Sequence, residues 1–418
     1  MLDQGTADLD PGAEPLADIE PSDPALFEHD AHWDMFRRLR EEDPVHFHPA
    51  SAYGPYWSIT RYADIVEIDS NWKDFSSAAG AIQLDSEFIT GPTADSVPIE
   101  SIISMDPPKH DQQRKAIVPG LSPANLLRLE GLVRERTRQV LDGLPIGEEF
   151  DWVSEVSSEL TMMMLATLLG WPVEDRNRLR FWSDMIAGRP GDGNVESWDH
   201  RQREMKVFAE TLLKVREERR AGAPADDLIS MLAHTPQAVG MDAVDYIANM
   251  ATLIVGGNDT TRNTMSGAVL AFHDHPAEWA KFKADPSLVS SLVPEAIRYQ
   301  TPIPYMSRRA NRDVEFRGKT IREGDKVVMW YISGNRDDRA IEDPERFIID
   351  RPRARQHLSF GFGIHRCPGN RVAELQLKIL WEEIARKDWT RIEVTHPPVR
   401  ARANGVRGIL SLPVIIQA

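Results

Sequence analysis

Residues 360–369 read Phe360-Gly361-Phe362-Gly363-Ile364-His365-Arg366-Cys367-Pro368-Gly369, and this segment holds the only cysteine of the chain. Its three glycines allow the close backbone approach that a flat ligand needs, and His365 and Arg366 place positive charge beside the sulfur. Apolar residues at helical spacing follow from Val372 onward, so we expect a helix whose N-terminus favours the thiolate form of Cys367. A lone cysteine more often acts as a small buried hydrophobic residue. This setting instead favours a reactive thiolate.

The cysteine segment resembles the haem-binding loop of the cytochrome P-450 family, the haem-thiolate monooxygenases. The family pattern is Phe, two residues, Gly, any residue, His or Arg, any residue, Cys, any residue, Gly, and it matches Phe360, Gly363, His365, Cys367 and Gly369. The resemblance implies that Cys367 is the axial ligand to the iron of haem b, iron protoporphyrin IX, and that its thiolate favours O–O cleavage. Pro368 has no N–H group, so one hydrogen bond to the sulfur is missing and the thiolate stays electron-rich.

A second motif, Gly256-Gly257-Asn258-Asp259-Thr260-Thr261, lies within a helix that the apolar spacing predicts from Ala243 to Phe272. Two adjacent glycines inside a helix cost about 1 kcal/mol each relative to alanine. Either a ligand lying against the backbone or close packing of a neighbouring helix would explain them. A threonine in mid-helix can bond back to a carbonyl one turn earlier and leave room for water or oxygen. Asp259 could then relay protons from solvent.

This motif resembles the oxygen-activating helix of the same family. The resemblance implies that Thr260 steadies bound dioxygen and that Asp259 assists proton delivery. Helical spacing places Thr252, Val255 and Gly256 one to two turns before Thr260, and we expect them to line the substrate pocket. Pro304 joins this list because it lies in a segment that resembles a specificity region of the family.

Charged residues elsewhere fit the same family. Glu295 and Arg298 are three residues apart on one helix face. The resemblance implies that they form a buried structural triad with Arg346, with no catalytic role. It also places His110, Arg114, Arg308 and His365 at positions that bind the haem propionates. Forked guanidinium donors suit such carboxylates.

The coarse periodicity predicts a mainly α protein with a small antiparallel β-rich lobe, and the resemblance implies that this is the cytochrome P-450 fold. We expect helices at 126–144, 156–169, 204–219, 243–272 and 288–299, and strands at 45–47, 56–60, 326–330 and 409–416. Residues 1–32 carry many acids, and we expect them to form a partly disordered lead. Residues 33–418 would then form a single haem-thiolate monooxygenase domain, because no linker or repeat divides them.

Composition limits the partners. The formal net charge of −16 argues against nucleic acid. No apolar run reaches the roughly 20 residues that span a bilayer, so we expect no membrane anchor. The single cysteine excludes an internal disulfide and fits a reducing, cytoplasmic location. Nothing in the chain resembles a flavin or iron–sulfur domain, so electrons must come from separate proteins, which the resemblance implies are a ferredoxin and ferredoxin reductase. The resemblance brings together a basic docking patch for an acidic donor, made of Lys109, Arg114, Lys115, Arg366 and Arg371.

The expected reaction is insertion of one oxygen atom of O₂ into an unactivated C–H bond of a small or linear apolar substrate. The resemblance is strongest to the bacterial branch that hydroxylates the terminal carbon of medium-chain alkanes. Alternatives are hydroxylation of a terpenoid or fatty acid, or a non-catalytic haem sensor or carrier. A peroxide-driven haem enzyme would need neither Asp259 nor Thr260, so the motif argues against that class.

Overall fold

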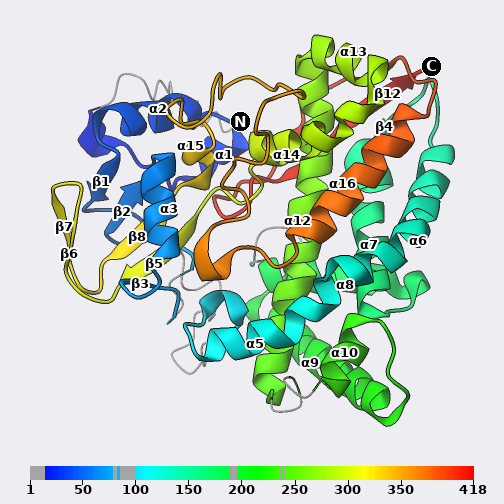
Figure 1. Cartoon of the computed structure of the whole chain (residues 1–418), viewed down its shortest axis with the longest axis horizontal. Helices are drawn as coiled ribbons and strands as arrows, with labels where there is room; N and C mark the ends of the chain where they lie inside the picture. Colours follow the sequence, from blue (N-terminus) through cyan, green and yellow to red (C-terminus); the bar gives the residue numbers. More distant parts are fainter. Residues whose placement is uncertain are drawn as a thin grey trace.

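The computed structural model describes residues 15–78, 82–84, 100–188, 190, 195–235, 238 and 241–418. Most of this chain is helical (Figure 1). The α-helices are α1 (Pro24–Glu28), α2 (Trp33–Glu42), α3 (Tyr62–Ser70), α5 (Lys109–Ile117), α6 (Pro123–Asp142), α7 (Glu159–Leu169), α8 (Arg176–Ala187), α9 (Trp198–Ala221), α10 (Leu228–His234), α12 (Ala243–Asp274), α13 (Pro276–Ala284), α14 (Val289–Gln300), α15 (Tyr331–Gly334) and α16 (Asn370–Ala385). None of these helices is long and apolar enough to cross a bilayer.

Helix α12 is the axis of the helical part, and Figure 1 shows it running through the middle of the molecule. It has 32 residues, and its N-cap Asp242 accepts a hydrogen bond from the backbone N–H of Asp245. Helices α7, α8, α14 and α16 all contact it. The predicted helix at 243–272 is therefore confirmed. The other four predicted helices are also present, and a π-helical stretch, Val153–Ser158, precedes α7.

The strands are β1 (Val45–His48), β2 (Tyr56–Ile59), β3 (Phe75–Ser76), β4 (Glu149–Asp151), β5 (Met306–Ala310), β6 (Val314–Phe316), β7 (Lys319–Ile321), β8 (Lys326–Met329), β9 (Arg391–Val394), β10 (Val399–Arg400), β11 (Ile409–Ser411) and β12 (Pro413–Gln417). The largest sheet has the order β1-β2-β8-β5-β3, and Figure 1 shows it away from the helical bundle. Its pairs are antiparallel except β2 with β8. The expected antiparallel lobe thus contains one parallel pair.

The predicted C-terminal strand at 409–416 is two strands. Leu412 separates β11 from β12, and its backbone N–H donates to the Asp151 carboxylate at 2.7 Å. Strand β11 then pairs with β10, whereas β12 lies between β4 and β9. Apolar residues recur through both strands without a break. The sequence pattern alone therefore does not show that β11 and β12 pair with different strands.

The boundary predicted at residue 33 requires a correction. Residues 1–14 lie outside the described residues, but residues 15–32 are part of the folded domain. Ile19, Leu26 and Phe27 are buried in one cluster with Phe36 and Trp330. Burial of three large apolar side chains outweighs the local acidic composition that indicated a disordered lead.

The third member of the structural triad is Arg351, and the prediction of Arg346 is wrong. Glu295 and Arg298 are fully buried and form two bonds of 2.8 Å. Arg351 Nε donates to Glu295 Oε2 at 3.0 Å. The Arg346 side chain is exposed and reaches only Asp343. Its backbone carbonyl nevertheless accepts from both Arg298 and Arg351. The backbone turns the neighbouring Phe347 into the core, so Arg346 points outward.

We expect Arg351→Gln to lower the free energy of unfolding by about 3 kcal/mol, because it leaves the buried Glu295 carboxylate with one cation fewer. Arg346→Gln should change it by no more than about 0.5 kcal/mol, as is usual at exposed positions. Urea unfolding of the two variants measures the difference. Equal losses in both variants would contradict the assignment of Arg351.

Candidate active site

The cysteine segment is a tight loop held between α3 and α16. A 3₁₀ turn spans Gly363–His365, and α16 begins at Asn370 after the N-cap Gly369. The backbone N–H of Cys367 donates to the Phe360 carbonyl at 2.8 Å and closes the loop. Pro368 therefore lies just outside the helix, one residue before its cap. The predicted position of the sulfur at the start of a helix is confirmed.

Cys367 is partly exposed even though it lies deep in the protein. Burial raises the pKa of its thiol above the ordinary value. The backbone N–H groups of Gly369 and Asn370 and the charges of Arg114 and Arg366 lower that pKa, but by less than burial raises it. The helix N-terminus thus favours the thiolate as predicted, but not enough to ionise the sulfur alone. A bound metal ion would complete the deprotonation.

Three of the predicted propionate ligands lie together at this loop. The rings of His110, on α5, and His365 are 4.6 Å apart between centroids and nearly perpendicular. Arg114, one turn further along α5, donates to the Arg366 carbonyl at 2.6 Å. Arg308, on β5, is close enough to affect His365, whose pKa falls to about 2 through burial first and then through Arg308, His110 and Arg114. His365 is therefore neutral.

Several hydrogen-bond donors of this cluster have no acceptor among the described residues. His110 Nε2 and Arg114 Nη1 are buried and make no hydrogen bond to a described residue. The ring nitrogens of His365 are also buried, with at most a weak contact to the backbone of Ile102. Buried donors without partners are rare in proteins. A ligand that carries carboxylates would satisfy them, so this chain's residues fit haem with its propionates.

The α12 motif has the back-bonded geometry that the sequence predicts. Thr260 Oγ1 donates to the Gly256 carbonyl at 2.9 Å, and Thr264 Oγ1 donates to the Thr260 carbonyl at 2.9 Å. Asn263 Nδ2 donates to the Asp259 carbonyl at 2.8 Å. Three carbonyls in this stretch therefore accept side-chain bonds.

The two adjacent glycines have different surroundings. A Cβ atom added to Gly256 would meet nothing within 4 Å, and Gly256 is exposed although α12 is central. A Cβ atom on Gly257 would lie 3.4 Å from Leu165 Cδ1 of α7. Gly256 thus borders an open space and Gly257 packs against a helix. Both explanations that the sequence left open apply, one to each glycine.

Asp259 is buried and ion-paired. Its Oδ1 accepts from Arg262 Nη2 at 2.9 Å, on the same helix. Burial raises the pKa of the Asp259 carboxyl, and the charges of Arg262 and of Arg180 on α8 offset part of that rise. A carboxyl with a raised pKa can release a proton nearer to neutral pH than an ordinary aspartate.

The predicted pocket positions on α12 are not fully buried. Thr252 and Val255 are partly exposed, on the open side with Gly256. Pro304 is buried, and its carbonyl accepts from the Ile332 N–H at 3.0 Å. Its neighbours Ile303 and Met306 are the partly exposed residues of that segment.

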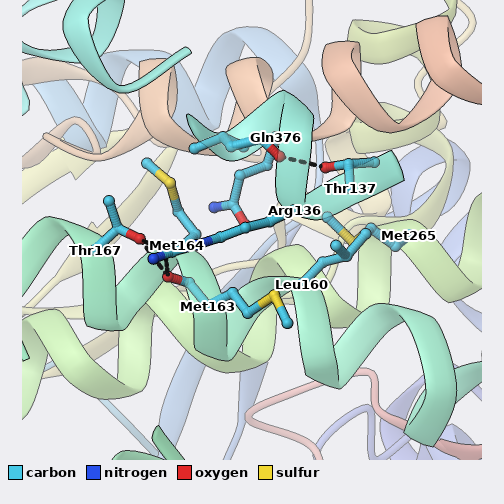
Figure 2. Close-up of a pocket in the computed structure, with 9 residues that line it drawn as sticks. Arg136, Thr137, Leu160, Met163, Met164, Thr167, Met265 and Gln376 are labelled. Carbon is cyan, nitrogen blue, oxygen red and sulfur yellow. Dashed lines mark hydrogen bonds between the residues drawn. The ribbon is translucent and has the colours of Figure 1, made fainter. Parts of the chain in front are cut away.

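A separate cavity of about 10 Å³ lies among α6, α7, α12 and α16 (Figure 2). It contains none of the predicted site residues. Its lining includes Arg136, which donates to the Met163 carbonyl and to Thr167. Such a volume holds about one water molecule, so this cavity is not the substrate pocket.

Sequence reasoning missed two residues that contact the predicted site. Arg262 could have been found, because it is three residues from Asp259 on the same helix. Asp69 had no local signal. Its carboxylate binds Arg308 at 2.6 Å across 239 residues of sequence.

Comparison with known proteins extends these observations to the whole chain. The family model described as Cytochrome P450 matches residues 284–387. Linalool 8-monooxygenase of Pseudomonas putida is 34% identical over 403 residues, which cover 94% of this chain and 97% of that protein. The solved structure of CYP153D17 from Sphingomonas sp. PAMC 26605 is 42% identical with a TM-score of 0.89, and the match covers 95% and 98% of the two chains. Cytochrome P450-153 from Novosphingobium aromaticivorans is 38% identical with a TM-score of 0.87, covering 96% and 100%.

Relatedness over nearly the whole length assigns the protein to the class of haem-thiolate monooxygenases. The chain belongs to the cytochrome P450 family. Its cofactor is haem b, its fold is the one predicted, and the family implies O₂, an electron donor and an apolar substrate.

We expect Cys367→His to abolish the strongly red-shifted Soret band of the reduced carbon monoxide adduct, because an imidazole cannot supply the thiolate's electron density. Absorption spectra of the purified, haem-loaded variant measure this. Arg366→Gln changes the adjacent exposed cation and should retain the band. Survival of the band in Cys367→His would show that another residue ligates the iron.

Proposed function

We propose that this protein hydroxylates the terminal carbon of medium-chain alkanes or related linear apolar substrates, with electrons delivered by a ferredoxin and its reductase. Haem, when bound, supplies the iron at which O₂ is activated. The observation that carries the proposal is the open side of α12, where Thr252, Val255 and Gly256 border a space beside Thr260. The linear substrate class rests on the resemblance of the sequence to the alkane-hydroxylating branch.

The chain's own residues have distinct roles in this proposal. Cys367 holds the iron, and His110, Arg114, Arg308 and His365 hold the propionates. All four can donate hydrogen bonds to carboxylates, and His110 and Arg114 have buried donors without a partner among the residues that the structure describes.

Proton delivery is assigned to Thr260 and Asp259. Thr260 holds a hydroxyl at the open side of α12, and its proton is held by the Gly256 carbonyl at 2.9 Å. Asp259, whose pKa burial raises, passes protons toward it as a general acid. Arg262 binds only Oδ1 of Asp259, so Oδ2 can take up and release a proton while the bond to Arg262 remains.

The proposed docking patch for an acidic electron donor rests mainly on cations without a strong local partner among the described residues. Lys115, Arg366 and Arg371 are exposed. Lys109 is paired with Asp245 at 3.0 Å and Glu100 at 3.3 Å, and Arg114 is turned toward the Arg366 carbonyl. In this proposal Lys115, Arg366 and Arg371 steer an acidic ferredoxin, and Lys109 contributes less because two carboxylates offset its charge. The single cysteine fits the reducing cytoplasm in which such a donor works.

A second candidate substrate is a terpenoid, because the 34% identical relative is named for linalool. The spectral change of ferric haem on titration with octane, octanoate and linalool separates the candidates. We expect octane to give the largest change at saturation, and turnover with ferredoxin, reductase and NADH to yield the primary alcohol. A preference for linalool would replace the linear substrate by a terpenoid. A lack of NADH consumption with all three ligands would favour a haem carrier.

We expect Thr260→Ala to uncouple turnover, so that oxygen consumption continues while product per NADH falls by about tenfold or more and peroxide rises. The matched control is Thr261→Ala, which removes the neighbouring hydroxyl from the buried side of α12. It should leave coupling near the wild-type value. Product and peroxide yields per NADH measure both variants. Unchanged coupling in Thr260→Ala would remove it from the proton path.

A further inference from the structure

One buried carboxylate outside the predicted site joins the cysteine loop to a predicted haem ligand. Asp69 lies in the last turn of α3 and is only 2% exposed. Its Oδ1 accepts from Arg308 Nη2 at 2.6 Å. Its Oδ2 accepts from the Tyr331 hydroxyl at 2.7 Å and from the Phe362 backbone N–H at 2.8 Å. The two oxygens therefore face different structures, one a cation on β5 and the other the loop that carries Cys367.

The guanidinium of Arg308 is fixed from two sides. Nη2 is held by Asp69, and Nη1 donates to the Ser307 carbonyl at 2.7 Å. A guanidinium has five N–H donors in a rigid plane. Once two of them are fixed, the direction of the others is fixed as well. Both bonds are made to the protein itself, so they restrict the Arg308 side chain without any contribution from the cofactor.

The loop fits against the same helix end. A Cβ atom on Gly363 would lie 2.4 Å from the Asp69 carbonyl and 2.9 Å from Ser70 Cα, and the φ angle of Gly363 is +63°. Any larger residue would push the loop away from α3. The Asp69 carboxylate and the end of α3 thus define the path of the chain five residues before Cys367.

We propose that Asp69 is a positioning residue for haem: its carboxylate aims Arg308 at a propionate and, through Phe362, fixes the loop that presents Cys367. It does not touch the cofactor in this proposal. The inference rests on haem binding, which the family establishes, and is independent of the substrate assignment.

A purely structural role for Asp69 predicts a different outcome. In that case the pair with Arg308 would only neutralise a buried charge, and a propionate could replace Asp69 as the counter-ion. Haem would then be held as well as before when Asp69 is changed. Asp64, on the same helix, offers a matched control, because it is also buried and paired with an arginine, Arg317, at 2.8 Å.

The test measures transfer of haem from the holoprotein to excess apomyoglobin, with urea unfolding of each variant alongside. We expect Asp69→Asn to speed transfer by about 10- to 100-fold, the range found when partners of ligating residues are removed. Asp64→Asn should leave transfer near the wild-type rate. Equal transfer rates in Asp69→Asn and Asp64→Asn would overturn the proposal.

A double-mutant cycle separates positioning from general stability. If Asp69 acts through Arg308, Asp69→Asn in an Arg308→Gln background should speed transfer far less than it does alone. A full additional effect in that background would overturn the part of the proposal that concerns Arg308. If Asp69→Asn does not fold, Tyr331→Phe decides, because it keeps the charge and removes one donor to the same carboxylate. We expect about 3-fold faster transfer, and an unchanged rate would count against Asp69.

Discussion

The buried pair of Glu295 and Arg298 is the interaction on which the site depends. Between α15 and the cysteine loop the chain has no strand and no α-helix, so its backbone groups need partners from elsewhere. Arg298 supplies them by donating to the carbonyls of Asn335, Pro344 and Arg346. Glu295 accepts from the N–H of Ile348. Removing one member of a fully buried charged pair is costly. Besides the two bonds between them, the side-chain hydrogen bonds of Glu295 and Arg298 tie the irregular chain to α14.

Hydrogen bonds connect this irregular segment to the start of the cysteine loop. The Asn335 side chain accepts from the Leu358 N–H at 2.7 Å and donates to Ser359 Oγ at 2.9 Å. Ser359 in turn donates to the Ile297 carbonyl of α14. The loop therefore begins at Phe360 from a fixed position and ends at α16, with α3 against its middle. Three elements distant in sequence hold one short segment.

Features formed by contiguous residues could be predicted from the sequence, whereas contacts between distant segments could not. The cysteine loop and the α12 motif were recognisable because their residues are contiguous. The prediction of Arg346 in the place that Arg351 occupies is wrong because the identity of the inward-pointing arginine depends on which way a few residues of irregular backbone turn. Asp69 was invisible because its partners lie 239 to 293 residues away. Residues 15–32 were predicted to be partly disordered from their acidic composition. They are folded because the burial of a few apolar side chains stabilises the segment more than its exposed acids destabilise it.

Gly256 and Gly257 are adjacent in α12, but one borders open space and the other contacts α7. Substitutions at the two positions therefore affect different properties, the free space beside α12 at residue 256 and the packing of the protein at residue 257. The side of α12 at Gly257 is bounded by α7, so added volume there acts on the packing of the protein. The side at Gly256 is bounded by open space, so added volume there acts on what can enter. Residue 256 could therefore change by several methyl groups with little effect on the fold, whereas at residue 257 the first methyl group already contacts Leu165 and any larger side chain must displace α7.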